Sequence, residues 1–207
     1  MNEVTKAIDS IRSSVERVGR SWRDTVYLDN VSFRVSATRF EVPDGADTMA
    51  AREDFYWFIL CEDHREPIPH PKPERSWWLK QFGKDAPPYG YTWDLDRVGD
   101  NLTTKGQERR AVLFNPTHPH PACILCYQFQ VVDHVSGGPY LDITTTMRSS
   151  DVVNCLPQDV LMTELLLHFM AERHGMVPGM MTFNIGNAHI YWDDLETWDE
   201  GVIDMPR

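Results

Sequence analysis

Cys123 is the residue of this chain whose sequence surroundings best suit covalent chemistry. It precedes an extended run, Ile124–Val131, and so sits at the mouth of a predicted strand. The pair Arg109-Arg110 comes before it and Arg148 comes after it. Thiolate, not thiol, is the nucleophilic form of cysteine, and nearby positive charge lowers the pKa of a thiol. We therefore predict that these arginines hold an anionic substrate and lower the pKa of Cys123.

The bulk composition predicts a globular, soluble protein with one domain spanning residues 1–207. Of its 207 residues, 42% are hydrophobic and 25% are charged, which is enough for a sizeable core. The net charge of -11 argues against nucleic acid as a partner, because nucleic-acid binders need a basic face. No apolar run approaches the ~18 residues of a membrane span, and no signal-peptide pattern opens the chain. Four cysteines without the spacing of a disulfide scaffold favour a reducing cytoplasm.

Hydrophobic spacing places the elements that must position Cys123. Helical periodicity predicts helices over 5–18, 53–60 and 159–174, the last of them apolar on most sides and therefore central and buried. Strand patterns cover 111–114, 124–131, 141–147 and 181–191, and residues 25–42 read as strands with a turn at Asp29-Asn30. Residues 62–92, rich in Pro, Lys and Trp, read as an irregular insertion.

Two other clusters have a simpler interpretation. The spacing Cys123-x-x-Cys126 suits a redox or zinc site, but residues three apart in a strand point to opposite faces, and no second cysteine pair follows. Glu164 and His168 share a helix face without a further ligand, so a structural histidine is favoured and no metal site is predicted. The remaining cysteines read as small buried apolar residues: Cys61, Cys126 and Cys155.

Four ordered motifs give the chain a resemblance to the thymidylate synthases, specific from about Arg109 to Leu195. They are Pro121-Ala122-Cys123 with Gln128-Phe129-Gln130-Val131, then Arg148-Ser149-x-Asp151 with Leu156-Pro157, then Gly186-Asn187-Ala188-His189-Ile190-Tyr191, and Arg109-Arg110 ahead of Asn115-Pro116. The resemblance implies an α+β fold in which a mixed sheet packs with helices. It also implies a homodimer formed sheet to sheet.

The same resemblance implies a role for each matching residue. Cys123 would attack C6 of a pyrimidine nucleoside monophosphate and make C5 nucleophilic. Arg148 and Ser149 would bind the 5'-phosphate, and Arg23 would complete that site. Arg109 and Arg110 would reach the same phosphate from the partner subunit. His189 and Tyr191 would bind the sugar 3'-hydroxyl. Asp151 and Trp78 would face 5,10-methylenetetrahydrofolate. Tyr89 and Asp54 would form a proton-transfer network, with Glu53 as the alternative to Asp54.

One departure from the family pattern bears on the substrate. Gln158-Asp159 follows Leu-Pro where the synthases have Phe-Asn, and that asparagine reads uracil. A carboxyl group can instead match cytosine, accepting from the N4 amino group and sharing a proton with N3. This substitution resembles deoxycytidylate hydroxymethylases and related cytidylate enzymes. The alternative is an acidic residue placed at a helix N-terminus by the helix dipole, which would oppose protonation.

Further departures concern the one-carbon chemistry. Ile124 stands where the family has histidine, the loop before Cys123 is shorter, and the sequence ends at Arg207 without the family's closing tail. Without that tail we expect water to reach the intermediate and give a hydroxymethyl product. The leading hypothesis is therefore a dCMP or CMP hydroxymethyltransferase that uses methylenetetrahydrofolate. The alternatives are a dUMP-acting synthase or hydroxymethylase, and a catalytically silent nucleotide-binding relative.

Overall fold

A single mixed sheet organises the computed structural model, which describes residues 2–61, 71–83, 89–104, 108–115, 122–134 and 138–195. The strand order is β1 (Arg20–Trp22), β2 (Thr25–Ser36), β7 (Val177–Tyr191), β5 (Gly138–Met147), β4 (Ile124–His134) and β3 (Val112–Phe114), with β6 (Ser150–Asp151) paired to β7. β7 runs parallel to β5 and β6, and the other pairs are antiparallel. The predicted α+β class with a mixed sheet is confirmed.

Residues paired side by side on neighbouring strands form rows across the sheet, and successive rows point to opposite faces. The row Phe129, Ile143, Met181 and Val35 runs across four strands and is fully buried, so it forms the floor of the core. The next row carries polar side chains on the other face: Gln128, Thr144, Thr182 and Arg34. On that polar face Arg34 forms an ion pair of 2.9 Å with Asp142.

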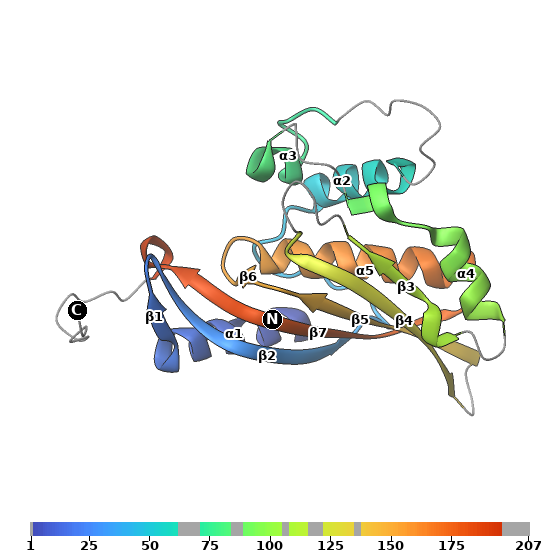
Figure 1. Ribbon diagram of the computed structural model, residues 1–207, viewed down its shortest axis with the longest axis horizontal. Coiled ribbons are helices and arrows are strands. Elements are labelled where there is room, and N and C mark those ends of the chain that lie inside the picture. Colours follow the sequence, from blue (N-terminus) through green and yellow to red (C-terminus); the bar gives the residue numbers. More distant parts are fainter. Residues whose placement is uncertain are drawn as a thin grey trace.

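Helix α5 (Leu156–Arg173) lies over the buried face, and helix α2 (Thr48–Cys61) lies over α5 (Figure 1). α5 contacts β5 and β7 below and α2 above, which is why it is buried on nearly every side. The predicted central helix is confirmed, although it begins at Leu156 instead of residue 159. Pro157 explains the earlier start, because proline is favoured in the first turn of a helix.

Helix α1 (Glu3–Val18) packs against β2 and β7. Its buried residues recur at helical spacing, as the sequence predicts: Val4, Ile8, Ile11 and Val15. The Asn2 side chain accepts a hydrogen bond of 2.7 Å from the Thr5 N–H, so the helix begins two residues before the predicted start.

The predicted turn at Asp29-Asn30 is wrong. β2 is one continuous strand, and its register with β7 is the same at Asp29 and at Val31. Asn30 has a φ of 55°, a left-handed conformation that asparagine tolerates better than most residues. Pairing with the long strand β7 therefore overrides the local turn signal, and the strand ends at Ser36 instead of near residue 42.

The described part of the predicted irregular insertion, 62–92, contains regular structure, so that prediction is wrong there. Helix α3 (Trp77–Phe82) is capped by Ser76, whose hydroxyl accepts from the Leu79 N–H at 2.9 Å, and the 3-10 helix η1 (Tyr89–Thr92) follows. A Cβ on Gly90 would lie 1.7 Å from the Phe58 carbonyl oxygen, so only glycine lets η1 approach α2 this closely. Residues 62–70 and 84–88 lie outside the described residues.

The remaining elements are α4 (Leu95–Thr103), η2 (Glu108–Arg110) and η3 (Trp192–Asp194). Strands β3, β4, β5 and β7 confirm the four strands predicted there. Over the described residues, none of the helices combines the length and apolar character that a bilayer crossing requires.

Candidate active site

Cys123 lies immediately before β4, and hydrogen bonds on both sides fix the backbone there. Its carbonyl oxygen accepts from the Arg148 N–H at 2.8 Å, which ties it to the end of β5. The Asn115 side chain donates to the Ile124 carbonyl oxygen at 3.0 Å and accepts from the Trp93 indole N–H at 2.8 Å. Hydrogen bonds from the backbone and from a buried side chain therefore fix the position of Cys123.

Arg148 and Ser149 surround the thiol. One guanidinium nitrogen of Arg148 lies 3.7 Å from the Cys123 sulfur, and the other donates to the Ser149 hydroxyl at 2.9 Å. The Arg148 Nε also donates to the Ala122 carbonyl oxygen at 3.2 Å. The structure thus brings together three residues that the sequence predicts in one site, with a cation and a hydroxyl beside the sulfur.

Arg148 lowers the pKa of Cys123 as predicted, but the pKa of the thiol is nevertheless raised overall. Burial raises the pKa of this thiol, and the negative charge of Asp159 raises it further. Arg148 and the Ser149 hydroxyl act in the opposite direction without reversing the result. The sequence shows the arginines but not the burial of the thiol and of Asp159, which decide the net direction of the shift.

Asp159 is the buried carboxyl group at the centre of the site. It lies in the first turn of α5, is 7% exposed, and has a pKa raised to about 7. Burial is the main cause, Asp151 adds to it, and Ser150 favours the ionised form. Its charge also raises the pKa of the Tyr89 hydroxyl, which is buried beside it. Burial thus outweighs the helix dipole that would keep this acid ionised.

Asp54 and Tyr89 line one small cavity with Asp159. The Asp54 carboxylate accepts hydrogen bonds from the Ser76 hydroxyl and, at 2.8 Å, from the Trp78 N–H. Burial nevertheless raises the pKa of Asp54. Glu53, the alternative to Asp54, is half-buried and does not line this cavity. The geometry therefore favours Asp54 for the predicted proton network.

His189 and Tyr191 sit near the end of β7, where β6 pairs with it and sets Asp151 opposite His189. The two rings meet edge to face with centroids 5.4 Å apart. The pKa of Tyr191 is raised by partial burial and by neighbouring acidic groups that include Asp151 and Cys123. This end of β7 therefore lies close to the thiol, as the predicted sugar contact requires.

The two residues expected to face folate have different surroundings. Both Asp151 carboxylate oxygens hold the turn before α5, accepting from the Val153 and Asn154 N–H groups at 3.0 and 3.1 Å and from the Asn154 side chain at 3.0 Å. Trp78 is a wall of the cavity beside Asp159, with its ring 4.5 Å from that of Tyr89. That these two residues face folate stays a prediction.

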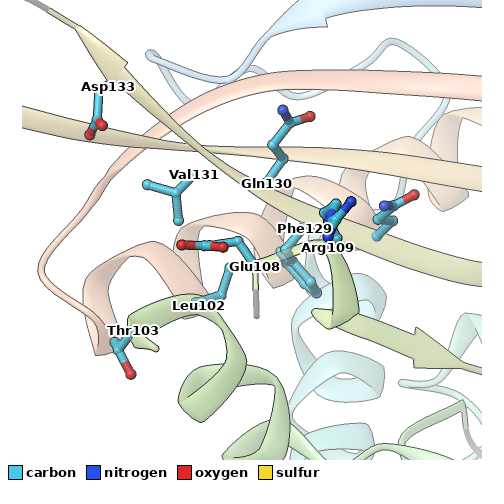
Figure 2. Close-up of a pocket in the computed structure, with 9 residues that line it drawn as sticks. Leu102, Thr103, Glu108, Arg109, Phe129, Gln130, Val131 and Asp133 are labelled. Atoms are coloured by element: carbon cyan, nitrogen blue, oxygen red, sulfur yellow. The ribbon is translucent and has the colours of Figure 1, made fainter. Parts of the chain in front are cut away.

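Arg23, Arg109 and Arg110 do not reach Cys123 within one chain. Arg23 stacks on Trp22, with its guanidinium carbon 4.5 Å from the ring centroid. Arg109 lines a separate pocket of about 540 Å3. Figure 2 shows it there together with Glu108, beside β4. Of the arginines in the described residues, Arg148 alone contributes to the pKa of Cys123. The prediction that the pair acts from a partner subunit stays a prediction.

Two residues near the thiol are missed by the sequence reasoning. Cys155 is the N-cap residue of α5, and its thiol has a pKa raised by burial and by the charges of Asp159, Asp151 and Cys123. It therefore belongs to the site instead of being a remote apolar residue. Gln158 lines the same cavity as Asp159. Their positions next to Leu156-Pro157 are the signal that could have identified both.

Comparison with known proteins identifies the family. The family model described as Thymidylate synthase matches residues 53–206. The chain belongs to this family. The thymidylate synthase of Enterobacteria phage T4 is 30% identical over 132 residues, covering 61% of this chain and 44% of the phage protein. The probable thymidylate synthase of Escherichia phage T5 is 38% identical over 81 residues, covering 39% of this chain and 28% of that protein.

A relative of more similar length is the putative thymidylate synthase of Methanococcoides burtonii. It is 28% identical over 182 residues, which cover 73% of this chain and 80% of that protein. The chain therefore spans less than half of the phage relatives but most of the archaeal one. The crystal structure of the T4 phage thymidylate synthase superimposes with a TM-score of 0.70 at 22% identity, covering 100% of this chain and 82% of that one. This likeness shows the thymidylate synthase fold.

Proposed function

We propose that this thymidylate synthase family member is a C5 hydroxymethyltransferase that converts dCMP or CMP to the 5-hydroxymethyl nucleotide with methylenetetrahydrofolate. The observation that carries the proposal is the buried Asp159 carboxyl, with a pKa raised to about 7, at the family position that reads the base. The catalytic nucleophile in this proposal is Cys123.

Cytosine recognition follows from the chemistry of a half-protonated carboxyl group. Cytosine presents an amino donor at N4 and an acceptor at N3. One oxygen of Asp159 would accept from N4, and the proton on its other oxygen would bridge to N3. Uracil presents the opposite pattern, a carbonyl acceptor at O4 and an N–H donor at N3, so it needs the acid proton on the other oxygen and has no donor for O4 once Asp159 is ionised. A pKa near 7 keeps the required proton available at neutral pH.

The same proton links base recognition to nucleophile formation. Asp159 raises the pKa of Cys123 while it is ionised, so the site accommodates one negative charge more easily than two. When Asp159 holds or shares a proton with N3, C6 becomes more electrophilic and the thiol ionises more readily. The Cys123 sulfur then bonds to C6, and the electron pair of the C5–C6 double bond moves to C5. When bound, the folate supplies the one-carbon unit that C5 accepts.

The side chains beside Cys123 support binding of a nucleoside monophosphate. Arg148 and Ser149 offer a guanidinium and a hydroxyl beside the sulfur, and Arg pairs well with phosphate. We propose that Arg109 and Arg110 of a second copy complete this site in a homodimer. The polar face of the sheet supports this arrangement, because η2, which carries both arginines, contacts β4 of that sheet. A free thiol nucleophile also suits a reducing cytoplasm.

The test is release of tritium from C5-labelled dCMP, CMP and dUMP, with and without methylenetetrahydrofolate, followed by chromatography of the products. We expect release from a cytidylate and a hydroxymethyl product. Cys123→Ser should abolish release while nucleotide binding, measured by calorimetry, persists. Cys126→Ser on the far face of the sheet is the matched control and should leave release unchanged.

The names of the relatives favour a second candidate, a dUMP-acting enzyme. Preferential release from dUMP would overturn the proposed substrate, and formation of dihydrofolate would identify methylation instead of hydroxymethylation. Nucleotide binding without release from any substrate would identify a catalytically silent relative.

A further inference from the structure

The Gln158 side chain carries a hydrogen-bond donor that no described residue uses. Gln158 lies in the first turn of α5 and is 3% exposed. Its Oε1 accepts a hydrogen bond of 3.1 Å from the Asp47 N–H, and this contact settles which end of the amide is oxygen. Its Nε2 is buried and has no hydrogen-bond partner within the described residues. Leaving such a group unsatisfied costs about 1–3 kcal/mol, which implies a missing acceptor.

The missing acceptor belongs in the cavity that Gln158 shares with Asp54 and Asp159. This cavity leaves a volume of about 10 Å3, and its other walls are mainly aromatic. That volume suits about one water molecule, and a buried water needs two or more polar partners. The Asp54 carboxylate accepts from the Ser76 hydroxyl and the Trp78 N–H, and a carboxylate offers about four lone-pair sites in all. A residue with an unused donor, Gln158, and a residue that can accept further hydrogen bonds, Asp54, therefore line the same water-sized space.

We propose that Gln158 is a positioning residue that holds a water between its Nε2 and the Asp54 carboxylate, and that this water attacks the one-carbon unit on C5. The inference deepens the proposed function and rests on it. Gln158 stands where the family pattern has phenylalanine, an apolar side chain that offers no donor. The substitution thus adds a hydrogen-bond donor at a position where the family pattern has none.

Each bond that forms when this water attacks is matched by a bond that breaks. The water oxygen bonds to the exocyclic methylene carbon, and its proton passes to Asp54. The electron pair of the C5–methylene double bond moves to C5 and then forms the C5–C6 double bond. The C6–S bond breaks, and Cys123 leaves as a thiolate. The product carries a hydroxymethyl group at C5.

The experiment compares Gln158→Met, which keeps the shape but removes the donor together with the acceptor of the Asp47 N–H, with Gln81→Met on the exposed surface of α3 as the matched control. Three quantities are measured. They are tritium release from C5-labelled dCMP without folate, kcat and KM for the hydroxymethyl product, and ordered water in crystal structures of both the native protein and Gln158→Met.

We expect Gln158→Met to retain release and KM for dCMP but to lose about tenfold or more in kcat for the product, roughly the effect of one hydrogen bond. A water within about 3 Å of Gln158 Nε2 should appear in the native crystal and be absent from the variant. Unchanged product formation would overturn the inference, and so would loss of release in parallel with product. If the native protein releases no tritium, the proposed function fails first, and the crystallographic water then decides the site independently.

Discussion

Replacing Asp159 with asparagine tests whether one buried carboxyl controls both base choice and the reactivity of Cys123. Burial raises the pKa of Asp159 from 3.8 to about 7, which corresponds to a preference of about 4 kcal/mol for the neutral form. Asparagine has nearly the same shape and carries no charge at any pH. The substitution therefore removes the charge and leaves the packing of α5 largely intact.

The first expected result is a pH-dependent gain in stability. The favourable contribution of neutral Asp159 to folding is fully present below pH 3.8 and is lost as the pH rises through about 7. At pH 8 the variant should therefore unfold at higher denaturant concentration than the native protein, by up to about 4 kcal/mol. Below pH about 4 the difference should disappear. Asp9→Asn on the exposed face of α1 is the matched control and should show no such dependence.

The second expected result concerns the Cys123 thiol and needs no substrate. Ionised Asp159 raises the pKa of Cys123, so its removal should lower that pKa. At pH 8 the rate of alkylation by iodoacetamide should therefore rise, because a larger fraction of the thiol is ionised. Peptide mass spectrometry assigns the modified cysteine. At pH 5.5 the native protein and the variant should react at similar rates, because Asp159 is then neutral.

The third expected result is a change of base preference. An asparagine donates to O4 and accepts from N3–H of uracil, and a mismatched pair of hydrogen bonds costs about 1–3 kcal/mol. The ratio of kcat/KM for dCMP over dUMP, measured by tritium release, should therefore fall by about tenfold or more. Unchanged alkylation together with an unchanged ratio would refute the reasoning, because neither role of Asp159 would then exist.

Two other substitutions follow from the same structure. Arg148→Ala should raise KM for the nucleotide by about tenfold or more. Arg148→Lys should restore little of the nucleotide binding, because a lysine cannot engage sulfur, Ser149 and phosphate through one planar group. A native KM in Arg148→Lys would contradict this. Glu164 is fully buried, and burial raises its pKa from 4.5 to about 7. Glu164→Gln should therefore stabilise the protein by about 3 kcal/mol at pH 8, and should leave its stability unchanged below pH 4.5. Denaturant unfolding at the two pH values measures this, and a gain that does not depend on pH would contradict it.

The hydrophobic pattern of the sequence is sufficient to predict the central elements. α5 is apolar on most sides, and β5 and β7 alternate buried residues with more exposed ones at the period of a strand, so the packing of these elements follows from local sequence. The predicted turn at Asp29-Asn30 shows the limit of this reasoning. The signal for a turn is local, but the uninterrupted pairing of β2 with β7 depends on residues about 160 positions away.

The ordered motifs of the sequence are sufficient to predict Cys123, Arg148 and Ser149 as one site, and the structure brings them together. They could not predict the direction of the thiol pKa, which depends on how deeply the sulfur is buried and on the charge of Asp159. The free Nε2 of Gln158 was equally hidden, because an unsatisfied donor exists only relative to the atoms packed around it.

The sequence by itself determined the family motifs, the positions of the main strands along the chain and the candidate nucleophile, because residue type and spacing are properties of the chain. Only the tertiary structure decided the protonation of Asp159 and Cys123 and the shape of the cavity beside Gln158. The physical reason is that desolvation and charge coupling act through space, between groups that are distant in the sequence.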